Sequence, residues 1–413
     1  MPRIFWERLS QVAYFLCLLF LPFQFGKHFW PPYTQVSGIR IDYLSPTIYP
    51  TDIFILLLFL FSFKDYFRNF SFKKQQLFFY LIPFLIIGIV QSRVPQAGIY
   101  GLIKFFEIAF FGWYTAIFSN RHRQAIANIF SLTIIVEALL AIVQFLLQRS
   151  IGGLFYFLGE RTFSAQTPGI ANARINGGLL LRAYATFPHP NVFAGFLVLS
   201  MIYILLVLKK TTNLAMLSLL LGTVALFLTL SRVAILFWVG FLLLVVFRKT
   251  GKKAIKWAAI TCALVVILFS PLRFRFFDNS FFSDALLPRK ELLGYSLEMI
   301  KAYPLFGVGI NNFYAVLASL QKPTVENLSY YLQPVHNIFL LVASESGIIV
   351  GVLFFGTFVY KIASLAKSAF TYPVFFMLLF IFLVGFSDHY FLTLQQGQLL
   401  LAFVFGLSFA KQN

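Results

Sequence analysis

Residues 333–351, QPVHNIFLLVASESGIIVG, join a polar loop that ends at His336 to an apolar segment that carries Glu345. The apolar part is predicted to begin a membrane-spanning helix, because about 20 apolar residues cross the hydrocarbon core of a bilayer. A histidine at the mouth of such a helix is costly enough to indicate a function. Two arginine-bearing segments, at Arg182 and around Arg289, are predicted to lie on the same side of the membrane. We interpret the three together as a candidate active site.

The whole sequence has the composition of a polytopic membrane protein. Of its 413 residues, 60% are apolar and only 11% are charged. The apolar runs are continuous rather than alternating, which favours a helical bundle over a β-barrel. The net charge of +19 would indicate nucleic-acid binding in a soluble protein. Basic clusters between spans orient a membrane protein, however, so membrane lipids and no nucleic acid are expected as partners.

Runs long enough to cross the bilayer predict twelve helices. They lie at residues 10–26, 51–63, 77–90, 97–118, 124–147, 191–208, 212–230, 232–247, 254–270, 336–360, 369–387 and 391–409. Short loops on one face carry the basic residues Arg3, Arg8, Lys64, Arg68, Lys73, Lys74, Arg121, Arg123, Lys209, Lys210, Arg248, Lys249, Lys252, Lys253, Lys361, Lys367 and Lys411. Because basic loops remain in the cytoplasm, both termini are predicted to be cytoplasmic. The first span is predicted to be retained rather than cleaved.

Besides the substantial segment 27–50, two longer segments are predicted on the extracytoplasmic face, residues 148–190 and 271–335, within one polytopic membrane domain that covers residues 1–413. Loops of this length are usually functional. The first contains several glycines and is predicted to be loop, with a short helix near residues 154–158. The second lies between the ninth and tenth spans and is predicted to carry part of the active site.

The stretch Pro288–Ala302 of the second loop is predicted to be a short helix. Pro288 suits the first helical position, and Leu293, Leu297 and Ile300 recur on one face. We expect this helix to lie over the membrane mouth like a lid.

Arg289 is thereby predicted to lie in the first turn of that helix. Free backbone N–H groups and a guanidinium make a good phosphate site, since the arginine fork matches phosphate oxygens. The alternative is a snorkelling or solvated arginine. Arg182 opens RAYATFPHPNVFAGFL, with His189 just beyond it, and is expected at the outer interface. Arg232 begins the eighth span and faces either the bundle interior or the headgroups.

His336 follows Pro334 at the start of the tenth span, where a helix N-terminus and an apolar setting favour the neutral imidazole. Such a group accepts a proton; alternatively it caps the helix or hydrogen-bonds Asn337. Glu345 lies about 13 Å further along a helix, so a structural hydrogen-bonding role is expected for it. Asp388 and His389 mark the outer turn before the last span.

The sequence lacks several common cofactor motifs. It has no glycine-rich nucleotide loop, no paired His/Cys zinc spacing and no H-E-x-x-H arrangement. Cys17 and Cys262 both lie inside apolar runs, which indicates buried thiols. A reaction without metal or cofactor is therefore expected.

Four segments, taken in order, resemble the O-antigen ligase family, whose wider group includes O-antigen polymerases and protein O-oligosaccharyltransferases. They are RAYATFPHPNVFAGF from Arg182, TLSRVAI around Arg232, RKELLGYSLEMIKAYPLFGVGINNF from Arg289, and PVHNIFLLVASESGIIVG around His336. Two departures are Ala185, where the family often has glycine, and His189, where a small or polar residue is usual.

The resemblance implies an all-α, GT-C-like integral membrane protein that acts on the outer face of the cytoplasmic (inner) membrane. Such enzymes move a glycan from undecaprenyl diphosphate to a hydroxyl acceptor, a glycolipid such as lipid A core or another surface glycan, with inversion and without a metal. By this resemblance Arg182 and Arg289 hold the diphosphate, with Arg232 as a further partner, and His336 orients or deprotonates the acceptor. Supporting roles fall to His189, Asn337, Glu345 and Asp388.

Two alternatives remain open. An O-antigen polymerase would use a second lipid-linked repeat as acceptor and bind the same donor. A transporter or flippase of lipid-linked sugar would instead need ionisable residues along a path through the midplane. The main interior ionisable residues are Lys104, Glu107, Glu137 and Glu345.

Overall fold

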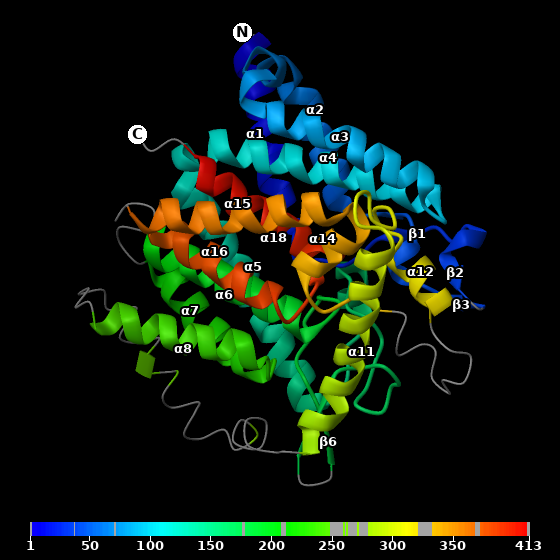
Figure 1. Cartoon of the computed structure of the whole chain (residues 1–413). Coiled ribbons are helices and arrows are strands. Elements are labelled where there is room, and N and C mark those ends of the chain that lie inside the picture. The colour runs from blue at the N-terminus through cyan, green and yellow to red at the C-terminus, as the bar shows by residue number, and fades with distance from the viewer. Residues whose placement is uncertain are drawn as a thin grey trace.

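The computed structural model describes residues 2–36, 38–69, 72–175, 178–207, 212–247, 280–320, 333–367 and 372–410, with residues 259, 260, 262 and 271. Helices dominate the described chain (Figure 1). They are α1 (Pro2–Phe20), α2 (Pro50–Asn69), α3 (Phe72–Gln91), α4 (Pro95–Phe118), α5 (Arg123–Leu147), α6 (Pro190–Val207), α7 (Asn213–Leu228), α8 (Arg232–Phe247), α11 (Ser280–Ala302), α12 (Phe313–Leu320), α14 (Ile338–Ser346), α15 (Ile348–Ala366), α16 (Tyr372–Gly385), α17 (Tyr390–Thr393) and α18 (Gln395–Phe409).

Short strands and 3-10 helices lie in the connections. Strand β1 (Lys27–His28) pairs with β4 (Thr47–Ile48), β2 (Gln35–Val36) with β3 (Ile39–Arg40), and β5 (Asn172–Ile175) with β6 (Gly178–Leu181), all antiparallel. The 3-10 helices are η1 (Pro32–Thr34), η2 (Asp42–Leu44), η3 (Ser119–His122) and η4 (Gly153–Leu158). The short helix expected near residues 154–158 is therefore present as η4, whereas the β5–β6 hairpin was not predicted.

Several helices have the composition of membrane spans. Among the described residues, the stretch Pro95–Leu147, which contains α4 and α5, and helix α15 are long and apolar enough to cross a bilayer. Large apolar side chains face outward on these helices, including Ile103, which is 59% exposed, and Val352, which is 63% exposed. Together with the helical fold, this outward apolar surface supports the expected all-α membrane protein. The count of twelve spans stays a prediction.

Helix α6 forms the centre of the bundle. Its sequence, PNVFAGFLVLSMIYILLV, is apolar on every face, which is typical of a helix that is buried all round. It contacts α5, α7, α8, α16 and α18, and its side chains from Val192 to Leu205 are almost entirely buried. Pro190 begins the helix, so His189 and Asn191 are held at its outer end. One side of the candidate site is therefore held by a helix that is buried among five others.

The tenth predicted span, residues 336–360, is not one helix. The chain forms the nine-residue helix α14, turns at Gly347, and continues as α15. Gly347 has φ +88° and ψ 162°, a conformation that is essentially restricted to glycine. A Cβ atom there would lie 2.0 Å from the carbonyl oxygen of Leu305. His336 consequently precedes a short helix, and α15 supplies the apolar length.

The helix predicted to begin at Pro288 is also longer than expected. Helix α11 begins at Ser280, and Pro288 lies inside it. A proline removes one internal hydrogen bond, but the preceding residues SFFSDALL include good helix formers that carry the helix through. Arg289 is therefore not in a first helical turn. The predicted ninth span, residues 254–270, lies outside the described residues apart from three positions.

Candidate active site

A cavity of about 1400 Å³ lies where the predicted outer loops meet the ends of the helices. Arg289 from α11, His336 before α14, and the Asp388 and His389 pair before α17 all line it. His189 and Asn191 contribute from the start of α6. Segments that are far apart in the sequence thus meet around one space. In Figure 1, α11 runs crosswise to α15 and α16, and it packs against α14.

His336 is positioned by the cap of α14. The side-chain oxygen of Asn337 accepts hydrogen bonds from the backbone N–H groups of Phe339 and Leu340, both at 3.0 Å. Asn337 is thus the N-cap, which leaves the imidazole of His336 free of that task. The Nδ1 atom of His336 is buried and has no hydrogen-bond partner among the described residues. It lies 3.9 Å from Oδ1 of Asp388, and the ring lies 4.9 Å from that of His389.

Asp388 connects the histidines to Arg182. Its Oδ1 accepts a hydrogen bond from the backbone N–H of His389 at 2.8 Å, and its Oδ2 accepts one from the Asn191 amide at 2.7 Å. Asn191 in turn accepts a hydrogen bond from the Arg182 guanidinium at 2.7 Å. A chain of hydrogen bonds therefore runs from Asp388 through Asn191 to Arg182, and His336 lies 3.9 Å from the carboxylate at its end.

Burial favours neutral imidazoles around an ionised carboxylate. It lowers the pKa of His336 to about 4, against a smaller opposing effect of Asp388, and it lowers the pKa values of His189 and His389 to about 3 each. Burial alone would raise the pKa of Asp388, but the three histidines and the hydrogen bond from Asn191 outweigh it and hold that pKa below its usual range. The site therefore contains a proton acceptor beside a fixed negative charge at neutral pH.

The three predicted arginines differ in their access to the cavity. Arg289 is half-buried and lines it directly. Arg182 is 6% exposed, donates through Nε to the Thr229 carbonyl at 2.7 Å, and reaches the cavity through Asn191. Burial lowers the pKa of Arg182 to about 10, so it remains charged at neutral pH. Arg232 begins α8 and lies near enough for its charge to act on Arg182.

Glu345 has the structural role expected from its depth. Its carboxylate accepts a hydrogen bond from the backbone N–H of Phe313 at 3.2 Å, at the first residue of α12. The backbone N–H groups of Val308 and Gly309 donate in return to the carbonyls of Ser344 and Glu345, both at 2.9 Å. The glycine-bearing turn after α11 is therefore hydrogen-bonded to the end of α14, and it fixes the helix that His336 precedes.

Sequence reasoning missed part of this arrangement. Asn191 was noted only for its place at the start of a span, yet it joins Arg182 to Asp388. Asp388 and His389 were placed at the outer turn before the last span without a link to His336, and the structure brings them against His336. The sequence feature that indicates a role for Asn191 is the run Pro188 to Asn191, which places a histidine and an amide at the start of a predicted span.

His336, Asp388 and His389 are also residues of the types that bind metal ions. The ligand atoms of His336, Asp388 and His389 all lie within 4.8 Å of one another. Tetrahedral zinc, with bonds of about 2.0–2.1 Å to nitrogen, needs ligand atoms about 3.3 Å apart. The cluster would have to contract to hold such an ion, and the positive charge of Arg289 opposes it. A metal-independent reaction stays our prediction.

The central segment of the chain is similar to a known protein family. Residues 217–355 match the family described as O-Antigen ligase. This match supports an assignment to the O-antigen ligase family. The matched segment contains Arg232, Arg289 and His336, whereas Arg182 and Asp388 lie outside it. No curated protein matches the chain. The O-antigen ligase family implies glycosyltransferase-like ligase or polymerase activity in a membrane.

Proposed function

We propose that this protein moves a glycan from undecaprenyl diphosphate to a hydroxyl acceptor at the outer face of the cytoplasmic membrane, as an O-antigen-ligase-type transferase. The observation that carries the proposal is the shared cavity, which is lined by both Arg289 and the half-buried imidazole of His336, two residues of the matched family segment. Both termini are cytoplasmic in this proposal, and the acceptor is lipid A core or another cell-surface glycan.

Arginine supplies the charge that the leaving group needs. When the bond between the anomeric carbon and the diphosphate oxygen breaks, the electron pair and the negative charge pass to the diphosphate. Arg289 binds these oxygens from α11, while the buried charge of Arg182 and the neighbouring Arg232 add positive potential behind it. The proposed diphosphate contact rests on the guanidinium, since α11 provides no free N-terminus at Arg289.

His336 acts as the general base in this proposal. The acceptor oxygen attacks the anomeric carbon from the face opposite the diphosphate, which inverts the configuration, and its proton passes to Nε2 of the neutral imidazole. Nδ1 keeps its own proton throughout. Oδ1 of Asp388 lies 3.9 Å from Nδ1, and the charge of this carboxylate stabilises the imidazolium that forms. His189 and His389 complete the polar wall around the carboxylate.

The polymerase remains the nearest alternative, because it binds the same donor and differs in the acceptor that reaches His336. The charged residues in the interior of the bundle do not favour the alternative of a lipid-linked sugar transporter. Lys104 is paired with Asp52 and Glu107, Glu137 accepts hydrogen bonds from Thr186, and Glu345 accepts one from Phe313. Each of these residues therefore has a structural partner within the bundle.

Two variants test the assignment of roles. In a transfer assay with an undecaprenyl-diphosphate-linked glycan, His336→Ala should lower the rate by about 10²–10⁴-fold, the usual contribution of a general base. Arg289→Ala should lower it by about 10²–10³-fold, as when one oxyanion donor is removed. The matched controls are His122→Ala, at the end of η3 and away from the cavity lining, and Lys290→Ala, the exposed neighbour of Arg289. Full activity in either test variant would remove that residue from the mechanism.

A further inference from the structure

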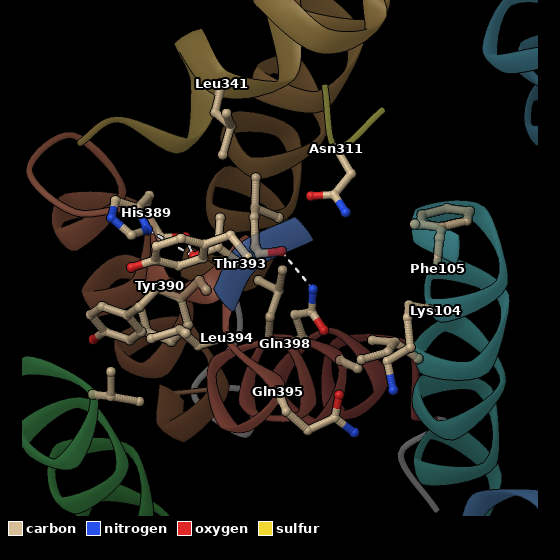
Figure 2. Close-up of a pocket in the computed structure, with 18 of the residues that line it drawn as sticks. Lys104, Phe105, Asn311, Leu341, His389, Tyr390, Thr393, Leu394, Gln395 and Gln398 are labelled. Atoms are coloured by element: carbon tan, nitrogen blue, oxygen red, sulfur yellow. Dashed lines mark hydrogen bonds between the residues drawn. The ribbon is translucent and has the colours of Figure 1, made fainter. Parts of the chain in front are cut away.

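The cavity has a second polar end that the proposed chemistry does not use. Lys104 from α4, Gln395 and Gln398 from α18, and Asn311 line this part. Figure 2 shows these side chains around one space, with Gln395 extending from α18 toward the helix that carries Lys104. In the sequence, the four-residue helix α17 lies between His389 and Gln395.

The charge of Lys104 is already neutralised. Its ammonium lies 2.8 Å from Oδ1 of Asp52 and 2.9 Å from Oε2 of Glu107, and its side chain is 9% exposed. One cation between two carboxylates is a poor receptor for a phosphate, in contrast to the arginines at the other end. This end of the cavity is therefore suited to an uncharged polar group.

Gln395 lines this part of the cavity, and its amide oxygen is a buried hydrogen-bond acceptor. Its amide nitrogen donates to Asp52 at 2.6 Å and to Thr51 at 3.1 Å, which fixes the orientation of the amide. The residue is only 6% exposed, and its amide oxygen is buried without a hydrogen-bond partner among the described residues. A buried acceptor without a donor is costly, and each such group calls for a partner. A hydroxyl group would satisfy it.

The surroundings match a sugar ring. The rings of Tyr49 and Tyr100 line the cavity near Lys104, and aromatic walls with a few placed polar groups are typical of binding pockets. The subsite is also tied to the proposed reaction centre, since His389 contacts Thr393 at 2.7 Å and Gln398 donates to the Leu392 carbonyl at 2.6 Å. Both contacts lie within or beside α17.

We propose that Gln395, held by Asp52 and assisted by Gln398, binds hydroxyl groups of the acceptor sugar. This inference rests on the proposed transferase function and adds the location of the acceptor's sugar ring. In it, the arginine end receives the charged diphosphate, and the Gln395 end receives the uncharged acceptor. A ligand that lacks the bonded hydroxyl would leave the amide oxygen unpaired, which is how such a site discriminates.

The test separates the acceptor from the donor by kinetics. The acceptor used is whichever of lipid A core, a second lipid-linked repeat or a cell-wall polymer the wild-type protein glycosylates. Gln395→Met should raise the KM for this acceptor about tenfold, the effect of one net hydrogen bond, and leave kcat and the donor KM unchanged. Gln398→Met is a second test variant, in case Gln395→Met does not fold.

Gln396 provides the matched control. It is the next residue of α18 and is 2% exposed with an unpartnered amide nitrogen among the described residues, yet it is not on the cavity lining. Gln396→Met should leave the acceptor KM unchanged. Equal effects of the Gln395 and Gln396 variants, or a change in the donor KM instead, would overturn the inference. Absence of transfer by the wild-type protein would instead refute the transferase function.

Discussion

Proton chemistry at His336 depends on the groups that surround its ring. The ring is half-buried, Asp388 lies on its Nδ1 side, and His389 lies beside it. Because Asn337 caps α14, the imidazole is not used for the helix and can meet the acceptor. Asp388 itself is held by Asn191, which is fixed at the start of α6. The proposed base is therefore positioned by side chains from three separate parts of the chain.

The lowered pKa of His336 predicts a dependence of both activity and stability on pH. Unfolded His336 takes up a proton below its ordinary pKa of 6.5, whereas the folded protein does so only near 4. Stability is therefore complete above pH 6.5 and falls as the pH drops from about 6.5 toward 4. This residue contributes at most about 3 kcal/mol to that loss, and thermal unfolding at pH 7 and pH 5 would measure it.

The activity profile tests the same property independently. The acid limb of kcat/KM should lie well below pH 6.5, since the base stays neutral down to about pH 4. The variant His336→Gln should unfold with a weaker pH dependence between pH 7 and 5. An acid limb at pH 6.5 would contradict the assignment of the buried imidazole as the base.

Single residues show where sequence reasoning works and where it fails. The family often has glycine at position 185, and Ala185 indeed has φ +53°, a conformation that favours glycine. The neutrality of His336 was also predictable, from its place beside an apolar segment. Its contact with Asp388 was not predictable, because 51 residues lie between the two positions and several helices must pack before the two side chains meet.

At the scale of elements, the break between α14 and α15 determines where His336 lies. A helix of nine residues spans only about 14 Å, less than half of a hydrocarbon core of about 30 Å. The sequence does not reveal this break, because the apolar run continues through Gly347 and isolated glycines are common in spans. The turn at residues 304–312 stabilises the break, through the hydrogen bond from Ile348 to the Pro304 carbonyl and those to Ser344 and Glu345.

Substitution of Gly347 tests the importance of this break. Gly347→Ala should destabilise the protein by at least about 2 kcal/mol, because alanine is strained at φ +88° and its Cβ would collide with Leu305. Thermal unfolding in detergent measures the effect. The control is Gly356→Ala on α15, where the Cβ meets no atom within 4 Å and a gain of about 0.5–1 kcal/mol is expected. Equal stability of the two variants would show that α14 and α15 tolerate a continuous helix.

Across the whole molecule, one cavity joins two chemically different ends. Arg289 and the histidines line one end, and Gln395 with Lys104 lines the other. The order of the arginine and histidine segments along the chain made the first end predictable through the family resemblance. The second end was not, since Lys104 was noted only as an interior charge, and its pairing with Asp52 requires α2 and α4 to pack together.

The most direct measurement is a transfer assay with purified protein, an undecaprenyl-diphosphate-linked glycan, and three separate acceptors: lipid A core, a second donor molecule and a cell-wall polymer. We predict that one acceptor gives a larger glycan product together with released undecaprenyl diphosphate, and that His336→Ala slows the formation of both by about 10²–10⁴-fold. Product on lipid A core would identify a ligase, and product on the second donor a polymerase. Folded protein that binds the donor but transfers the glycan to none of the three acceptors would contradict the proposed function.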